Sequence, residues 1–301
     1  MFPHQIRRRL KFTAEHAEDA ANNLILISAT SAISAVNSLE DWQLQLYKKS
    51  FKKKEKIDLL LNSLQHLQGK LCLEVGCARG TVSHFLRNAG GTWFHADTDH
   101  SNVQSAIALL KKDVIQIPKN RLPFPDATFD VIVSLDYLEH VHDDQAAMNE
   151  LKRVLKPGGQ LLVSTPTTGP AFVLNKIKPA IGLTLDKYGH VREGYDLSDL
   201  SQRLQNQGYE ILSSSTYSRF FTEFIEMGVN FAFVKILGKG MEGESSKRDG
   251  NITIGSQESF QKHQASMKVY SVAYPFIWTF TRLDRIWPFQ GYALMIEARK
   301  K

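Results

Sequence analysis

The sequence has little cysteine and no long apolar run, and each shortage excludes a class of protein. Only two cysteines occur, Cys72 and Cys77, and they lie too near each other in the chain to staple distant elements together. A disulfide-built secreted domain is therefore excluded, and a reducing, cytoplasmic setting is expected. No stretch reaches the roughly eighteen uncharged apolar residues that a membrane-spanning helix needs. We expect a soluble protein, or one peripheral at the inner face of the membrane.

What remains has the composition of an ordinary globular protein. Apolar residues make up 43% and charged residues 23% of the 301 residues, a length that suits one large α/β domain with additions. The formal net charge is +6, and cationic residues gather at 7–11 and 48–56. Nucleic acid or an anionic membrane surface could attract such an excess. A solvated helix face is the simpler interpretation of each cluster.

Strand-like and helix-like patterns alternate over residues 70–165, which predicts a parallel sheet covered by helices on both faces. Strands are expected at 70–75, 92–97, 114–117, 129–135 and 160–165. Helices are expected between them at 81–88, 101–111 and 144–155. A capped helix over 196–207 and strands over 210–217 and 291–299 complete a Rossmann-like, mostly parallel sheet of seven strands.

Three regions follow from this pattern. Residues 1–67 are expected to be an N-terminal helical extension. The Rossmann-like domain covers 68–217 and 291–301. Residues 218–290 form an aromatic helical insertion, with a flexible loop at 239–256 that is rich in Gly, Ser and charge.

A glycine-bearing turn after the first expected strand is the most informative motif. Gly76 and Gly80 let the backbone bend sharply and let a ligand approach closely. Asp97 ends the next strand, where a carboxylate can accept hydrogen bonds from ribose hydroxyls. The spacing does not fit the G-x-G-x-x-G of a dinucleotide site, and Glu74 would lie close to a pyrophosphate. An acid beside the turn suits a cation-bearing ligand, so the dinucleotide interpretation is rejected.

With these motifs the sequence resembles the class I S-adenosylmethionine-dependent methyltransferases, especially the ubiquinone/menaquinone biosynthesis branch. The family's first motif, acid-x-Gly-x-x-x-Gly, is met by Glu74, Gly76 and Gly80, and its ribose-binding acid aligns with Asp97. Further matches lie in order at 122–126, 129–133, 138–141 and 150–159. The similarity is strong over residues 69–166 and weaker beyond them.

The resemblance implies S-adenosylmethionine as the cofactor. The residues expected to bind it are Glu74, Gly76, Cys77, Ala78, Gly80, Asp97, Thr98, Asn120 and Asp136. Two departures concern this set. Ala78 stands where the family often has a third glycine, and no acid follows the third strand, so Asn120 is the expected adenine contact. Asp99 is either an alternative ribose ligand or the N-cap of the next helix.

Three residues are expected to be catalytic or to contact the methyl acceptor. His140 follows the fourth strand, at the sheet edge where such folds bind ligands. In the resembled family, a His-x-Arg segment such as 190–192 borders the acceptor pocket, which adds His190 and Tyr195. The competing interpretations are backbone hydrogen bonding for His140 and helix capping for the second cluster. No metal site is expected, because the His and Asp residues of 140–144 lack the i, i+4 spacing of helical ligand pairs.

The predicted function is methyl transfer from S-adenosylmethionine to oxygen or carbon of a small or lipid-like acceptor. The insertion would be a lid over that acceptor, a peripheral membrane contact through 218–290, or a packing or dimer face. Two alternatives stay open: a nucleic-acid methyltransferase, which the sequence after the fourth strand makes unlikely, and a non-catalytic, cofactor-binding partner protein. The oligomeric state is not specified by the sequence.

Overall fold

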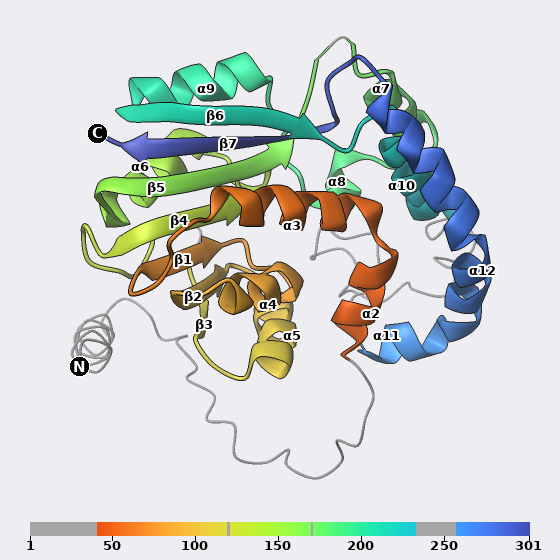
Figure 1. The fold of residues 1–301 in the computed structure, drawn as a ribbon, viewed down its shortest axis with the longest axis horizontal. Helices are drawn as coiled ribbons and strands as arrows, with labels where there is room; N and C mark the ends of the chain where they lie inside the picture. The colour runs from red at the N-terminus through yellow and green to blue at the C-terminus, as the bar shows by residue number, and fades with distance from the viewer. Residues whose placement is uncertain (1–40, 119–120, 170, 233–256) are drawn as a thin grey trace.

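A seven-stranded sheet forms the centre of the computed structural model, which describes residues 41–118, 121–169, 171–232 and 257–301. The strand order is β3-β2-β1-β4-β5-β7-β6 (Figure 1). The strands are β1 (Leu71–Val75), β2 (Thr92–Asp97), β3 (Val114–Gln116), β4 (Phe129–Leu135), β5 (Leu155–Pro166), β6 (Tyr209–Tyr217) and β7 (Ala293–Lys300). Strands β1 to β5 pair in parallel, whereas β7 runs antiparallel between β5 and β6. The Rossmann-like sheet predicted from the sequence is confirmed.

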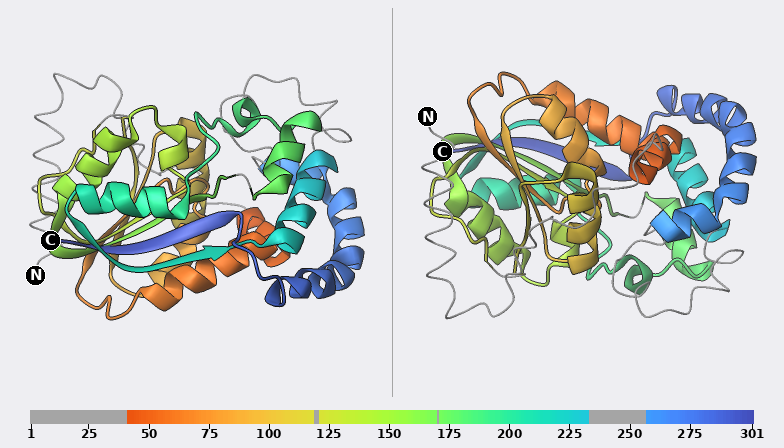
Figure 2. Two further views of the ribbon diagram at one scale, coloured as in Figure 1. Left: turned by 90° about the horizontal axis from the view of Figure 1, so that it is seen from above. Right: turned by 90° about the horizontal axis from the view of Figure 1, so that it is seen from below.

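Helices cover both faces of this sheet (Figure 2). They are α2 (Trp42–Lys49), α3 (Phe51–Ser63), α4 (Thr81–Asn88), α5 (His100–Leu110), α6 (Asp144–Val154), α7 (Val173–Ala180), α8 (Leu185–Tyr188), α9 (Leu197–Asn206), α10 (Phe220–Ala232), α11 (Gln257–Lys262) and α12 (Gln264–Thr281). Short 3₁₀ turns, η1 (Leu138–His140) and η4 (Arg282–Arg285), follow β4 and α12. Aliphatic side chains of α6 and α9 form one core cluster with the sheet, and those of α3 and α4 share a second on the opposite face.

Local sequence explains where several of these helices begin. The side chains of Asp99, Asp143 and Asp196 each accept a hydrogen bond from a backbone N–H of the first turn of α5, α6 and α9. Asp99 is therefore the N-cap that the sequence offered as one of its two roles. The cap expected at Asp196 is confirmed as well.

The described end of the N-terminal extension is part of the domain core. Leu60 of α3, together with Leu64 and Leu67, packs against the sheet in the cluster shared with α4. This burial places the amino-terminal half of α3, and α2 before it, beyond the carboxyl ends of the strands (Figure 1). Residues 1–40 of the expected extension lie outside the described residues.

The insertion between β6 and β7 is helical where it is described, as predicted. Helix α10 packs against α3, α7, α12 and η4, so residues far apart in sequence form one helical layer beside the sheet edge. The expected flexible loop at 239–256 lies outside the described residues. In the described ranges, no helix combines the length and hydropathy needed to cross a membrane.

Candidate functional site

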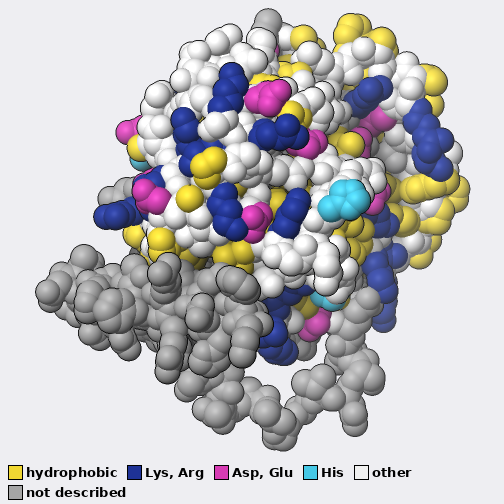
Figure 3. Space-filling view, turned by 60° about the vertical axis from the view of Figure 1, so that its left-hand side comes forward, with side chains coloured by type: hydrophobic (Ala, Val, Ile, Leu, Met, Phe, Trp, Pro, Cys, Tyr) yellow, Lys and Arg dark blue, Asp and Glu magenta, His cyan; other side chains and the backbone are white. Residues whose placement is uncertain are grey.

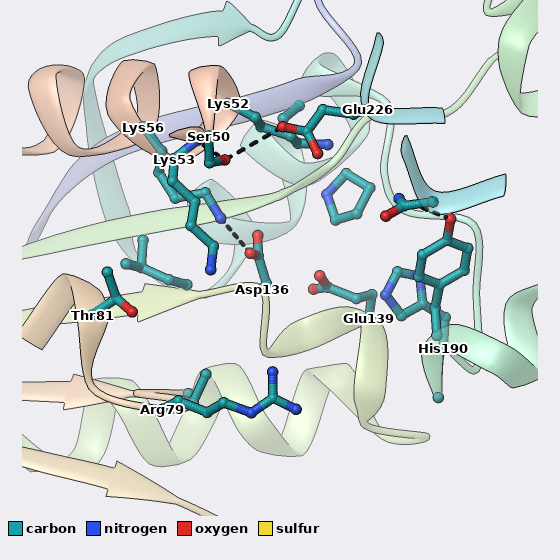
Figure 4. Close-up of a pocket in the computed structure, with 18 of the residues that line it drawn as sticks. Ser50, Lys52, Lys53, Lys56, Arg79, Thr81, Asp136, Glu139, His190 and Glu226 are labelled. Carbon is teal, nitrogen blue, oxygen red and sulfur yellow. Dashed lines mark hydrogen bonds and ion pairs between the residues drawn. The ribbon is translucent and has the colours of Figure 1, made fainter. Parts of the chain in front are cut away.

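A cavity of about 760 Å³ lies between the carboxyl edge of the sheet and this helical layer. Its wall is contributed by α2, α3, the turns after β1, β2 and β4, the α7–α8 region, α10 and α12. The volume lies within the range typical of small-molecule sites. Figure 4 shows side chains from these elements converging on one open space.

The glycine turn forms one end of the cavity. Gly76, Ala78 and Gly80 adopt φ values of 83°, 46° and 82°. A Cβ on Gly76 would lie 2.6 Å from the carbonyl oxygen of Leu135, so β4 approaches too closely for any side chain. Gly76, Cys77 and Ala78, three of the residues expected to bind the cofactor, line the cavity.

Asp97 is the last residue of β2 and lies next to this turn. Its carboxylate accepts hydrogen bonds from the backbone N–H of Ala78 (2.8 Å) and of Asp99 (2.9 Å). Burial raises the pKa of Asp97, and these hydrogen bonds oppose the rise. Asp97 and Thr98 both line the cavity, and the carboxylate retains acceptor capacity for a ligand hydroxyl.

Glu74 does not line the cavity with its side chain, which corrects the expected cofactor contact. It is fully buried below the turn, 2.6 Å from Nδ1 of His95, and it accepts a hydrogen bond of 2.5 Å from the Ser83 hydroxyl. These bonds tie β1 to β2 and to α4. Glu74 therefore holds the turn in place from beneath.

Gly80 is also a correction, because it faces α5. A Cβ there would lie 3.1 Å from Cα of Ala106. Gly80 does not line the cavity, so its part is to let α4 and α5 pack closely. Asn120, the expected adenine contact, lies outside the described residues.

Asp136, another residue expected to bind the cofactor, follows β4 with φ of 46° and lines the cavity. Its carboxylate is paired with the ammonium of Lys56 from α3. The ammonium outweighs the effect of burial and lowers the pKa of Asp136. This ion pair connects α3 to the sheet edge.

The two candidate histidines are brought together, although fifty residues of chain separate them. The rings of His140 and His190 are 4.8 Å apart, in an edge-to-face arrangement, and both line the cavity. Nδ1 of His140 is 2.9 Å from the carbonyl oxygen of Gly189. Burial, followed by the charge of His140, lowers the pKa of His190 to about 3.

Glu139 completes this cluster, and the sequence did not single it out. It is fully buried, and burial together with the charge of Asp136 raises its pKa to about 8. One potential ligand atom from each of Glu139, His140 and His190 lies within 4.8 Å of the others. In the sequence, residues 140–144 do not have the spacing of metal ligands. His190 comes close to Glu139 and His140 only in the tertiary structure. The absence of a metal stays a prediction.

Tyr195 does not line the cavity, which corrects its expected contact with the acceptor. It is buried in the core, where its hydroxyl is 2.7 Å from a carboxylate oxygen of Asp144 and accepts a hydrogen bond from Arg192. Arg192 also pairs with Asp144. The network anchors the segment after α8 to the start of α6.

At the end of the cavity away from the glycine turn lie three charged side chains, Lys52, Lys178 and Glu223, which we call the ionic wall. The sequence analysis did not identify them as site residues. Glu223 of α10 is 3.0 Å from Nζ of Lys52 and 2.7 Å from Nζ of Lys178. Burial alone would raise the pKa of Glu223, but these two ammonium groups lower it to about 2. The carboxylate therefore joins α3, α7 and α10.

The lysine cluster at 48–56 was interpreted as a solvated helix face, and this is wrong for Lys52, Lys53 and Lys56, which line the cavity. Lys56 follows Lys52 by four residues and Lys53 by three, and both spacings place side chains on the same side of a helix. That spacing was the available signal, but it does not say what the face meets.

Comparisons with known proteins agree with this geometry. Residues 73–163 match the model of a family described as a methyltransferase domain. A protein of Mycolicibacterium smegmatis named as a "probable S-adenosylmethionine-dependent methyltransferase" is 31% identical over 146 residues, which are 48% of this chain and 53% of that protein. A ubiquinone biosynthesis O-methyltransferase of Alkalilimnicola ehrlichii is 30% identical over 125 residues, 40% of this chain and 51% of that protein. The chain thus spans about half the length of these curated relatives.

Solved structures share the fold. A putative methyltransferase of Bacillus halodurans has a TM-score of 0.52 at 17% identity, covering 82% of this chain and 99% of its own. The [4+2]-cyclase SpnF has a TM-score of 0.54 at 18% identity, covering 82% and 80%. The resemblance to the class I methyltransferases is confirmed for the Rossmann-like domain. The cyclase shows that this fold also occurs in a protein named for another reaction.

Proposed function

We propose that this chain is an S-adenosylmethionine-dependent methyltransferase acting on oxygen or carbon of a small or lipid-like acceptor. The observation that carries the proposal is the turn at 76–78, which opens onto the same cavity as the carboxylate of Asp97. Cofactor and acceptor would share that cavity, whose volume lies within the range of small-molecule sites. The relatives named as methyltransferases support the same assignment.

The described residues fit the cofactor. Asp97 offers a carboxylate to ribose hydroxyls, and Gly76 leaves the space above the turn free of a side chain. When bound, the cofactor supplies a methyl group on a sulfonium, already activated for displacement. The protein then has to position the acceptor in line with that methyl group and exclude water.

A hydroxyl acceptor also has to lose its proton, and the cluster after β4 supplies the candidates. His190, with its pKa near 3, is a weak base at neutral pH, and Glu139, with its pKa near 8, is largely protonated. His140 is the third candidate, and its hydrogen bonding bears on the role. If its Nδ1 donates to the carbonyl of Gly189, Nε2 is left as an acceptor.

A buried carboxyl group at the cavity refines the acceptor class. A wholly apolar acceptor would leave Oε1 of Glu139, which has no hydrogen-bond partner among the described residues, desolvated and unsatisfied, which is costly. We therefore infer an amphipathic acceptor, whose polar group enters the cavity and whose apolar part extends toward α12.

Peripheral contact with an anionic lipid surface fits the same picture. On the outer face of α12, Val272 and Phe276 form an exposed apolar stripe, and the two residues are 76% and 78% exposed. Helix α12 has no acidic residue, and Lys268 and Arg282 are exposed beside the apolar stripe. Apolar side chains mixed with Lys and Arg are visible at the right-hand edge of Figure 3. Met267 and Tyr270 on the inner face of the same helix line the cavity.

Vesicle sedimentation tests this contact. Phe276→Ser should reduce sedimentation with phosphatidylglycerol vesicles several-fold, and Leu212→Ser, a matched change at an exposed leucine of β6, should not. Equal sedimentation of all three proteins would refute the lipid contact. A concentration-dependent dimer that Phe276→Ser abolishes would instead assign the stripe to a second copy.

The methyltransferase proposal is tested by calorimetry with S-adenosylmethionine and S-adenosylhomocysteine, followed by methyl transfer from labelled cofactor to lipid, small-molecule and nucleic-acid extracts. Saturable cofactor binding with a labelled product is the expected result. Cofactor binding without any product would favour a non-catalytic partner protein, and label on nucleic acid would favour that alternative. No affinity for either ligand would refute the assignment.

A further inference from the structure

Three cationic side chains approach one another where the glycine turn meets α3. Lys53 and Lys56 come from α3 and Arg79 from the turn, and all three line the cavity. Figure 4 shows Lys53 and Arg79 pointing into the open space beside Asp136 from opposite sides. Lys56 is neutralised by its ion pair with Asp136.

Lys53 is the member of this group without a direct partner. Its ammonium makes no hydrogen bond or ion pair with any residue in the described ranges, and its side chain is exposed to the cavity. Burial, followed by the charge of Arg79, lowers the pKa of Lys53 to about 8. Lys56 lowers it further, whereas Glu226 and Asp136 oppose the shift. An ammonium held in this way is stabilised by any anion that enters the space between it and Arg79.

The other lysines that line the described part of the cavity have contacts of their own. Lys52 and Lys178 share the carboxylate of Glu223 at the far end, and the Lys49 ammonium lies 5.0 Å from the centroid of the Tyr274 ring. Lys53, by contrast, faces Arg79 of the turn, and it lines the same cavity as Asp97, the expected ribose ligand. A ligand whose ribose meets Asp97 and whose charged end extends along the turn would reach Lys53 and Arg79.

From this geometry we propose that Lys53, together with Arg79, binds the carboxylate of the methionine moiety of the cofactor. The inference rests on the proposed function, because it needs a cofactor with a carboxylate at that end. Binding would convert Lys53 from a repelled ammonium into a paired one. Cofactor binding is therefore coupled to uptake of a proton when the pH is above that at which free Lys53 titrates.

Calorimetry with two ligands tests the site. S-Adenosylhomocysteine carries the carboxylate, and 5′-methylthioadenosine lacks the whole amino-acid part. Lys53→Gln should weaken S-adenosylhomocysteine binding roughly 10- to 100-fold, the range for one charge-assisted hydrogen bond, and leave methylthioadenosine within about twofold. Lys70→Gln, a control at the opposite end of β1, should change neither. Equal affinity of wild type and Lys53→Gln for S-adenosylhomocysteine would overturn the proposal.

Proton uptake gives a second readout, measured at pH 8.5 in buffers of different ionisation enthalpy. Wild type should take up a larger fraction of a proton than Lys53→Arg on binding S-adenosylhomocysteine, because the pKa of Lys53 is lowered in the free protein. Lys53→Arg should keep the affinity, because arginine stays protonated. The amino group of the ligand titrates alike in both proteins, so the difference isolates Lys53. No difference between the two proteins would contradict the coupling.

A further titration separates the two possible ligands that could bring a carboxylate to Lys53, the cofactor and the acceptor. Benzoate is titrated into protein saturated with methylthioadenosine. Benzoate binding that depends on Lys53, with S-adenosylhomocysteine unaffected, would assign the site to the acceptor and overturn the proposal. If neither nucleoside binds wild type, the proposed function itself fails.

Discussion

Replacement of Glu223 by glutamine tests whether the ionic wall holds the helical layer together. Glu223 is 3% exposed, and its carboxylate joins Lys52 of α3 to Lys178 of α7. It also accepts a hydrogen bond of 2.8 Å from the hydroxyl of Ser218, which precedes α10. Glu223→Gln keeps the shape of the side chain but leaves two ammonium groups without their anion.

The magnitude follows from the shift of the Glu223 pKa from 4.5 to about 2. A lowering of roughly 2.5 units corresponds to about 3 kcal/mol of stability, and the pKa of Lys52 is raised in the matching sense. Because the folded pKa is the lower one, this stability is present above the unfolded value. It is lost as the pH falls from about 4.5 toward 2. Breaking a buried pair from one side costs about 3–5 kcal/mol, which agrees.

Urea unfolding followed by circular dichroism measures the effect. At pH 7, Glu223→Gln should lower the free energy of unfolding by about 3 kcal/mol, and the difference from wild type should shrink below pH 4.5. Glu210→Gln is the matched control, because Glu210 is exposed and pairs with Arg299 at 4.0 Å on the surface, where such pairs contribute little. A variant as stable as wild type at pH 7, or a difference that does not change with pH, would refute the reasoning.

Three further predictions concern the turn and the corrected residues. Gly76→Ala should lower the free energy of unfolding by about 3 kcal/mol or more in thermal unfolding, because its Cβ meets the carbonyl of Leu135. Gly158→Ala, at a glycine with a similar φ and nothing within 4 Å of the added Cβ, should lower it by only about 1 kcal/mol. Similar losses in the two variants would contradict this account. Asp97→Ala should weaken S-adenosylhomocysteine binding at least about tenfold in calorimetry, and unchanged affinity would remove its ribose role. Tyr195→Phe should lower stability by about 1 kcal/mol without changing cofactor affinity or methyl transfer; a selective loss of transfer would restore its acceptor role.

Elements set by local sequence were predicted closely. The period of apolar residues located β1 to β4 and the helices between them, and side-chain caps such as Asp196 marked helix starts. Gly76 and Asp97 were predicted as site residues because a glycine in a turn and a carboxylate at a strand end are each visible in the local sequence, and both line the cavity. The family resemblance added the connection between them.

Other site residues could not be identified in this way. Glu74 and Gly80 matched the motif, yet Glu74 faces His95 and Gly80 faces α5. A motif shows which residue type occurs at a position. It does not show whether that residue contacts the ligand or packs against the rest of the protein. Tyr195 was misassigned for a similar reason, since Asp144 approaches it from a distant helix.

The sequence by itself determined the alternation of strands and helices, the bend after β1 and the cofactor class that the bend suits, because these depend on neighbouring residues and on backbone geometry. Tertiary structure alone decided that Lys52, Lys53 and Lys56 face a cavity, that Glu139 meets both histidines, and that Glu223 joins three helices. Burial and long-range charge set these outcomes, and both depend on residues far away in the chain. The physical environment of an ionisable side chain therefore depends on the complete fold. Its position on a helix face, by contrast, can be predicted from the spacing of residues in the sequence.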